Sequence, residues 1–214
     1  DRVDVLEQEG QQFVRVVDYK SGAKAFRLAD IVNGLNLQMF LYLFNVCADG
    51  SNPYAGVPAG VLYMHAARSV LTVETKSSAE RDIAGQEDKA FGMNGIVITN
   101  PDCDIPAAME HDLAGKYIPV RLKKSGVGGS LASLEQLGLL QRKIEALVAD
   151  MGNALQNGQI GQHPVQAKDH DKTCEYCDFA SVCAFKKSVT PRTYDDQTDS
   201  AVLAELEKEG ENHA

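Results

Sequence analysis

A run of β-branched and aromatic residues, Phe13-Val14-Arg15-Val16-Val17, ends directly in Asp18-Tyr19-Lys20. These residue types favour extended backbone and Gly10 suits a turn before the run, so the sequence predicts a strand that ends at the charged tripeptide. Side chains two residues apart on a strand share one face, which places Asp18 and Lys20 side by side. The chain must therefore bury the apolar run while presenting both charges at the edge of a sheet.

Two further acidic residues, Asp1 and Asp4, lie in the segment that reads as the neighbouring strand. One of them can hold a divalent cation together with Asp18, because Mg²⁺ takes one or two protein carboxylates and fills its other positions with water and phosphate oxygens. Lys20 adds positive charge where negative charge accumulates during phosphodiester hydrolysis. The pattern indicates a metal-dependent nuclease, although an Asp-x-Lys alone is more often just a charged strand end.

The stretch from Leu35 to Phe44 is apolar on nearly every side, which predicts a helix packed against the sheet. Gln38 and Tyr42 are four residues apart and share one face of this helix. Taken alone, they are a boundary residue and a core residue. Close behind the charged strand end, they are better interpreted as contacts to the DNA backbone and to the water network of the site.

Three cysteines lie within ten residues: Cys174, Cys177 and Cys183. Such spacing suits zinc or an iron–sulfur cluster better than disulfides, and the motif lacks a fourth ligand. Local spacing does not choose between the two metals, and His163 or His170 could complete a zinc site. Cys47 and Cys103 are interpreted as structural free thiols.

The composition predicts one substantial globular domain without a membrane-spanning segment. Of the net charge of −9, residues 195–214 contribute −6, so the sequence divides into a domain over 1–194 and an acidic tail over 195–214. We expect this tail to be weakly docked, although Val202, Leu203 and Leu206 would share one side of a helix. Few, clustered cysteines favour a reducing cytoplasm.

The expected elements alternate between strands and helices, which predicts an α/β fold with a central mixed sheet flanked by helices. Strands are expected at 2–8, 12–19, 57–73 with an interruption at 65–68, and 95–99, with helices at 34–48 and 134–156. Ser133 and Gln136 form a capping box for the last helix, and Gly158 ends it. Its apolar residues predict a buried stripe: Leu137, Ile144, Leu147, Val148, Met151 and Leu155. Residues 126–130 read as a flexible loop and not as a phosphate-binding loop, so ATP use is expected elsewhere.

Six sequence blocks occur in an order that is specific to one family. They are Asp1-Arg2-Val3-Asp4, Val16-Val17-Asp18-Tyr19-Lys20-Ser21-Gly22, Gly34-Leu35-Asn36-Leu37-Gln38 with Tyr42-Leu43, Gly60-Val61-Leu62-Tyr63, Met93-Asn94-Gly95, and Cys174-Glu175-Tyr176-Cys177-Asp178-Phe179 with Cys183. Over residues 1–185 the chain thus resembles the PD-(D/E)XK, or RecB-like, nuclease superfamily, and within it the nuclease domains of AddB-type helicase–nuclease subunits. The resemblance implies a restriction-endonuclease-like core.

The resemblance implies that Asp1 and Asp18 bind Mg²⁺ or Mn²⁺ and that Lys20, Gln38 and Tyr42 complete the catalytic site. The family's Gly-x-Ile precedes its first ligand and would lie upstream of this sequence, so we expect Asp1 to be frayed here. Asp4, the alternative ligand, is expected to support the loop.

In the family, three cysteines in this arrangement are the last ligands of a 4Fe–4S cluster whose first cysteine lies far upstream. The resemblance therefore assigns Cys174, Cys177 and Cys183 to such a cluster. Because that upstream cysteine lies outside these 214 residues, we expect the cluster to be absent, incomplete or replaced here.

The resemblance implies an exonuclease that cuts the 5′-terminated single strand during resection of double-strand breaks and recombinational repair in the bacterial cytoplasm. The implied partners are DNA ends and an AddA-type helicase–nuclease subunit. The alternative is a noncatalytic iron–sulfur scaffold with a nuclease fold that binds DNA ends without cutting them.

Overall fold

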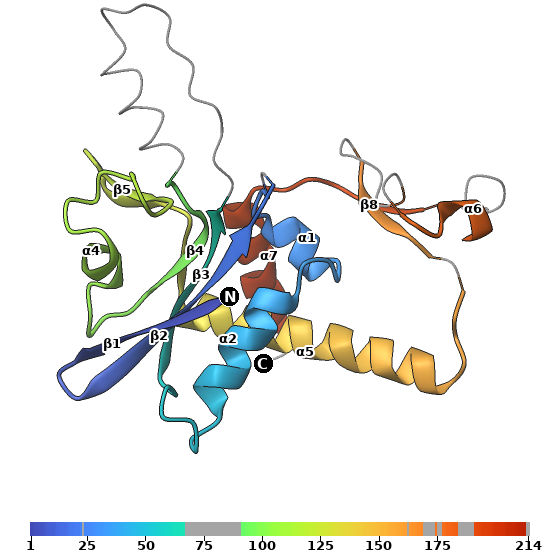
Figure 1. Ribbon diagram of the computed structural model, residues 1–214, viewed down its shortest axis with the longest axis horizontal. Coiled ribbons are helices and arrows are strands. Elements are labelled where there is room, and N and C mark those ends of the chain that lie inside the picture. Colours follow the sequence, from blue (N-terminus) through green and yellow to red (C-terminus); the bar gives the residue numbers. More distant parts are fainter. Residues whose placement is uncertain are drawn as a thin grey trace, which may run out of the picture. The chain divides into compact units, whose positions relative to one another are not determined.

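Five strands form one mixed sheet in the computed structural model of the chain (Figure 1). In their order across the sheet, they are β1 (Arg2–Gln8), β2 (Gln11–Lys20), β3 (Val57–His65), β4 (Asn94–Thr99) and β7 (Leu131–Ser133). The β2–β3 and β4–β7 pairs are parallel, whereas the β1–β2 and β3–β4 pairs are antiparallel. Helices accompany this sheet, which confirms the predicted α/β fold.

The described residues are 1–22, 24–66, 91–161, 163–168, 174, 177–183 and 191–212. They belong to two compact units, of which the first comprises 1–26 and 38–138 and the second comprises 27–37 and 139–214. The sheet belongs to the first unit. The limits 1–194 and 195–214 inferred from the sequence stay a prediction.

Alternation along β2 buries side chains on both faces of the sheet. Phe13 and Val17 join an apolar cluster to which Ile105 of α4 (Ile105–Met109) also belongs. Val14 and Asp18 point to the opposite face, because neighbouring positions on a strand alternate. The first unit also contains α2 (Gln38–Ala48), which packs on β2 and β3 and buries Met39, Phe40 and Leu43.

The predicted hairpin of β1 and β2 is confirmed. Glu9 and Gly10 connect the strands with φ of 53° and 79°, which is the left-handed backbone that a two-residue hairpin turn requires. The strand expected at 57–73 ends at His65 as β3, and residues 67–90 lie outside the described part. The strand expected at 95–99 is β4.

Helix α2 begins four residues later than the sequence pattern indicates, at Gln38 and not at residue 34. Gly34 and Asn36 have φ of 87° and 56°, which no right-handed helix can accommodate. A short helix that the sequence analysis did not predict, α1 (Leu28–Val32), precedes this turn.

Residues 126–130, predicted to be a flexible loop, are largely strand. β5 (Val120–Lys123) pairs antiparallel with β6 (Gly126–Gly129). At Gly129, a Cβ would lie 2.2 Å from the carbonyl oxygen of Pro119, so glycine is needed for this close approach.

A buried carboxylate anchors the loop that leads into this hairpin. Glu110 accepts hydrogen bonds from the backbone N–H groups of Lys116 and Tyr117, both at 2.9 Å, and of Ile118 at 3.1 Å. Burial by itself would raise the pKa of Glu110, but these backbone donors outweigh it and hold that pKa below its ordinary value. The charged form of Glu110 is therefore favoured by the fold.

The second unit contains most of α5 (Leu134–Gln156), α6 (Ala180–Cys183), α7 (Asp199–Asn212) and a parallel pair of short strands, β8 (Val165–Ala167) and β9 (Arg192–Tyr194). The predicted capping box at the start of α5 is confirmed. Ser133 N donates to Gln136 Oε1 at 2.8 Å, and Gln136 N donates to Ser133 Oγ at 3.1 Å. The predicted end is also confirmed, because Gly158 has φ of 69°.

The predicted buried stripe of α5 is correct only for its first half. Leu137 and Ile144 are buried, whereas Val148, Met151 and Leu155 are 40%, 44% and 68% exposed. Periodicity shows which side chains share a helix face, but it does not show how far a partner element extends along that face. Among the described residues, no helix combines the length and the apolar character needed to cross a bilayer.

The expectation of a weakly docked acidic tail is wrong for α7. Its apolar side is buried: Val202, Leu203 and Leu206 are 2%, 4% and 5% exposed. The Asp199 side chain also accepts a hydrogen bond of 2.8 Å from the backbone N–H of Leu28, at the start of α1. The acidic residues give the helix a solvated side, but its apolar side packs within the second unit.

Candidate active site

The carboxylate of Asp18 is buried near the end of β2, with 3% of the residue exposed. Lys20, on the same face, forms an ion pair with it through Nζ and Oδ2. In the described part of the chain, this buried oxygen accepts no well-formed hydrogen bond, so the lysine's positive charge is what offsets its desolvation. The predicted juxtaposition of Asp18 and Lys20 is therefore present.

Asp1 directly precedes β1, the strand that neighbours β2. The antiparallel register pairs Arg2 with Val17, so the next residue on each strand brings Asp1 opposite Asp18. Directly opposed residues of an antiparallel pair point to the same face. Asp1 is exposed, as expected for a residue at a strand end.

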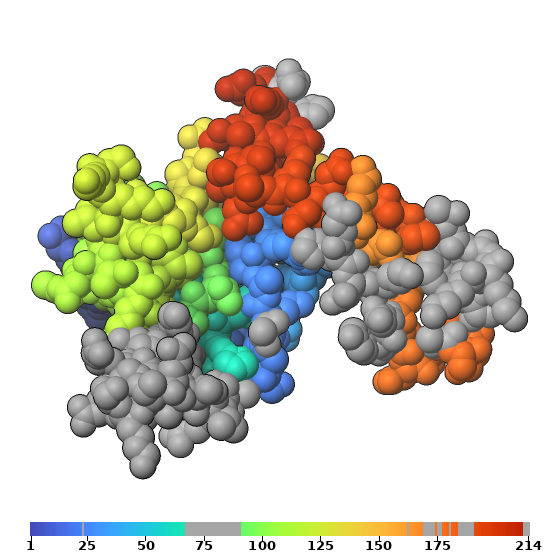
Figure 2. Space-filling view, turned by 90° about the horizontal axis from the view of Figure 1, so that it is seen from above, coloured from blue at the N-terminus to red at the C-terminus, as the bar shows by residue number. Residues whose placement is uncertain are grey.

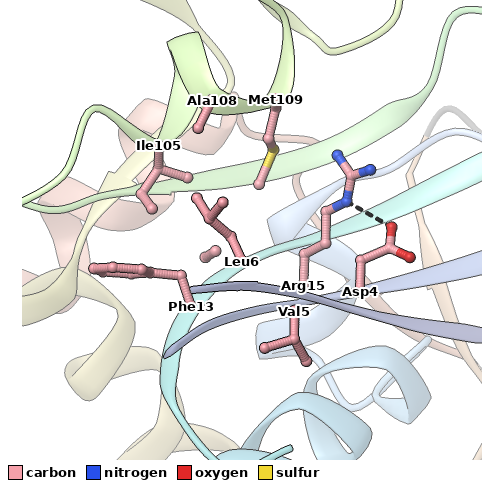
Figure 3. Close-up of a pocket in the computed structure, with 9 residues that line it drawn as sticks. Asp4, Val5, Leu6, Phe13, Arg15, Ile105, Ala108 and Met109 are labelled. Carbon is pink, nitrogen blue, oxygen red and sulfur yellow. Dashed lines mark hydrogen bonds and ion pairs between the residues drawn. The ribbon is translucent and has the colours of Figure 1, made fainter. Parts of the chain in front are cut away.

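Asp4 points to the opposite face of the sheet and forms ion pairs of 2.9 Å with Arg2 and with Arg15. Figure 3 shows Asp4 and Arg15 pointing toward one another on one side of the hairpin, whereas Val5 points to the other. They line a cavity of about 180 Å³ beside α4. Asp4 is therefore separated by the sheet from Asp18, which argues against it as the alternative metal ligand.

Two residues of β3 adjoin Lys20 that sequence reasoning did not assign to the site. Lys20 Nζ lies 5.5 Å from the ring centroid of Tyr63, which is 6% exposed. The parallel register pairs Asp18 with Tyr63 and Lys20 with His65, and His65 Nδ1 lies 3.3 Å from the carbonyl oxygen of Gly22. Tyr63 stood within one of the family's sequence blocks, but no local pattern indicated that it supports the lysine.

Gln38 and Tyr42 are both exposed on α2, and Gln38 Nε2 donates to the Tyr42 hydroxyl at 2.8 Å. The structure therefore brings these two residues together, as the spacing predicted. No described contact joins either of them to Asp18 or Lys20. Their assignment to the catalytic site stays a prediction.

The residues at the end of β2 fit a small divalent cation. Asp18 offers a buried carboxylate whose Oδ2 is paired with Lys20 but accepts no well-formed hydrogen bond from a described donor, and Asp1 offers a second carboxylate from the facing position. No group of three or more histidine, cysteine or acidic side chains gathers among the described residues in a way that could hold a metal alone. That is compatible with Mg²⁺, which completes its shell with water and phosphate oxygens, and much less so with zinc.

The cysteine motif has a chemically suitable donor set but no assembled site. Cys174 and Cys183 are partly buried and Cys177 is exposed, and none of the three forms a disulfide with a described cysteine. The described residues do not gather these thiols into a metal-binding group, and Cys177 N meets the carbonyl oxygen of Cys174 at 3.4 Å. His163 is exposed, and His170 lies outside the described residues. Among the described residues, these thiols are therefore not assembled as the ligands of a cluster or a zinc ion.

The other two cysteines are free thiols, as predicted. Burial raises the pKa of the Cys47 thiol to about 11. Burial also raises the pKa of Cys103, whose Sγ lies 3.1 Å from Gln8 Oε1. Thiols with raised pKa values are poor nucleophiles and poor metal ligands at neutral pH, so neither is a candidate for chemistry.

Known proteins match this chain over the stretch that contains the candidate site. The PD-(D/E)XK nuclease superfamily matches residues 1–184. The chain is 33% identical over 222 residues to an ATP-dependent helicase/deoxyribonuclease subunit of Bacillus cereus, a match that covers 98% of this chain. The corresponding subunit of Oceanobacillus iheyensis is 33% identical over 225 residues, and that match covers 100% of the chain. The chain spans 19% of the length of both relatives. It belongs to the PD-(D/E)XK nuclease superfamily.

Proposed function

We propose that this chain is the nuclease domain of a bacterial helicase–nuclease subunit and hydrolyses phosphodiester bonds of single-stranded DNA. The observation that carries the proposal is the buried Asp18 carboxylate with the Lys20 ammonium against it, at the end of a strand that faces Asp1. Such a buried carboxylate, paired with a partly exposed lysine, is costly as a purely structural feature, which supports a functional role.

In this proposal, Asp1 and Asp18 hold Mg²⁺ or Mn²⁺, which when bound polarises the phosphoryl oxygen and activates water. Lys20 faces the scissile phosphate and stabilises the negative charge that develops there, and Tyr63 fixes the position of its ammonium group. Gln38 and Tyr42 form a hydrogen-bonded pair on α2 that offers an amide and a phenol to the DNA backbone.

The partner proposal rests on the relatives, whose names describe a subunit of an ATP-dependent helicase and deoxyribonuclease. We propose an AddA-type subunit as the partner, cleavage of the 5′-terminated strand at DNA ends during break resection, and the bacterial cytoplasm as the compartment.

The close spacing of the three cysteines in the sequence supports a 4Fe–4S cluster in the longer protein. Iron and sulfide analysis of anaerobically purified full-length protein tests this, with four irons per chain as the expected result. Replacing Cys174, Cys177 and Cys183 together by serine should abolish iron binding. A triple variant that keeps its full iron content would contradict the assignment of the cluster to these cysteines.

Cleavage of labelled single-stranded DNA with Mg²⁺ or Mn²⁺ tests the nuclease proposal. Asp18→Asn and Lys20→Met should each lower the rate by at least about 100-fold, since preorganised charges at a reacting phosphate are worth that much. Asp4→Asn is the matched control, because it removes a carboxylate from the other face of the same hairpin. A chain that binds DNA but does not cut it in the full complex would instead support the noncatalytic scaffold.

A further inference from the structure

The hairpin of β5 and β6 carries a concentration of positive charge in an otherwise acidic chain. Residues 113–134 contain no aspartate or glutamate, whereas the whole chain has a net charge of −9. The basic residues of this segment are Lys116, Arg121, Lys123 and Lys124. Arg121, Lys123 and Lys124 are exposed, and none of these three forms an ion pair with a described carboxylate.

The strand register gives this hairpin two different faces. Arg121 is paired with Gly128 and Lys123 with Gly126, so both cations stand on a face whose opposing positions lack side chains. A Cβ added at Gly126 would meet nothing within 4 Å, and the three atoms nearest to one added at Gly128 would belong to the flexible Lys123 side chain, at 3.3 Å. A polyanionic backbone can therefore approach the peptide groups closely between the two cations.

The base of the hairpin is tied to the catalytic end of the sheet. Met93 N donates to the carbonyl oxygen of Tyr117 at 2.9 Å, and Asn94, the next residue, is the register partner of Tyr63. Tyr63 in turn lies beneath the Lys20 ammonium. The four steps from Tyr117 to Arg121 span at most about 14 Å, so Arg121 lies within that distance of the residue hydrogen-bonded to Met93.

An exposed aromatic ring precedes the basic residues of β5 in the chain and belongs to Tyr117, the residue hydrogen-bonded to Met93. Tyr117 is 42% exposed, with Lys116 Nζ 5.1 Å from its ring centroid. Exposed aromatic rings beside basic residues are the platform on which single-stranded bases stack. In Figure 2 the atoms of this yellow-green region lie at the surface, and in Figure 1 β5 lies in the same part of the first unit as β4.

We propose that the glycine-lined face of the β5–β6 hairpin binds the phosphate backbone of the single strand that enters or leaves the nuclease site, through Arg121 and Lys123. This proposal rests on the proposed nuclease function and adds to it a binding surface outside the reacting centre. The charge favours DNA as the ligand. Exposed cations beside glycine backbone can bind phosphates, and an exposed tyrosine can stack with bases.

Fluorescence anisotropy of a labelled oligothymidylate in EDTA measures binding without cleavage. Arg121→Gln combined with Lys123→Gln should weaken binding roughly tenfold or more at low salt and lower the slope of log K against log salt by about 1.4, since each single-strand phosphate contact contributes about 0.7. Arg142→Gln combined with Lys208→Gln removes the same arginine and lysine charge from exposed positions on α5 and α7, and should leave the slope unchanged. Arg121→Lys combined with Lys123→Arg should retain binding.

Equal binding by the hairpin variant and the control variant would overturn the proposal, and so would an unsubstituted chain that does not bind the oligonucleotide. A hairpin variant that binds DNA normally but no longer captures an acidic partner protein would assign the surface to protein contact and overturn it as well. Thermal melting verifies that each variant is folded. The readout needs no metal, so failure of Mg²⁺-dependent cleavage refutes the nuclease function while leaving the binding result intact.

Discussion

The ammonium group of Lys20 lies 5.5 Å from the ring centroid of Tyr63 and also forms an ion pair with Asp18. The lysine thus contacts a carboxylate from its own strand and an aromatic face from the neighbouring strand. A cation over an aromatic face is stabilised by about 0.5–2 kcal/mol, depending on its desolvation. In the proposed reaction, Tyr63 would act through the position of Lys20.

Tyr63→Leu should lower the cleavage rate about threefold to tenfold, because the ring face that restrains Lys20 is lost. Tyr63→Phe keeps the ring and should retain most of the activity. Single-turnover cleavage of labelled single-stranded DNA by both variants measures the effect. Equal losses in both variants would show that the hydroxyl group matters and not the contact with the lysine.

Mg²⁺ should stabilise the folded chain through Asp1 and Asp18. A ligand at ten times its Kd adds about 1.4 kcal/mol of stability, which corresponds to about 3–6 °C in Tm for a chain of this size. Thermal unfolding with Mg²⁺ and with EDTA should show this shift in the unsubstituted chain and in Asp4→Asn. The shift should disappear in Asp18→Asn, and its persistence there would place the cation elsewhere.

Glu110 should make the free energy of unfolding depend on pH. The pKa of its folded carboxyl lies below the ordinary value of 4.5, so its contribution is present above pH 4.5 and is lost as pH falls through the lower folded pKa. At neutral pH, Glu110→Gln should cost about 2 kcal/mol, as expected for hydrogen bonds to a charged acceptor.

Urea unfolding across the acid range measures this difference. It should shrink once the unsubstituted carboxyl is protonated, whereas Glu7→Gln, at an exposed position of β1, should have little effect at any pH. If the loss of unfolding free energy in Glu110→Gln does not change with pH, the shape of the side chain, and not its charge, stabilises the loop.

Leu206→Ala should destabilise the chain by about 2–5 kcal/mol, because the side chain is only 5% exposed and its removal leaves a cavity under α7. Leu155→Ala is the matched control, since the same side chain is 68% exposed there and surface changes usually stay within about 0.5 kcal/mol. Thermal or urea unfolding measures both. Equal, small effects would restore the view of residues 195–214 as a weakly docked tail.

Much of the local structure could be predicted because its causes lie within a few residues. The strand ending in Asp18 and Lys20 follows from a run of β-branched residues and from the two-residue period of extended backbone. The start of α5 follows from Ser133 and Gln136. Their spacing of three residues lets each side chain accept a hydrogen bond from the other residue's backbone N–H group. The pairing of Gln38 with Tyr42 follows in the same way from the helical repeat.

Tertiary structure decided what depends on contacts between distant segments. The register of β1 against β2 brings Asp1 opposite Asp18 and turns Asp4 to the other face, and the register of β2 against β3 brings Tyr63 and His65 beside Lys20. The two-residue turn at Glu9 and Gly10 sets the first of these registers locally. No local pattern sets the second, and a shift of one residue there would turn Tyr63 and His65 away from Lys20. The sequence by itself thus determined which strand end and helix carry the candidate residues. The pairing of β2 with β3 determined which side chains surround Lys20, because these strands are far apart in the chain and no local pattern aligns them.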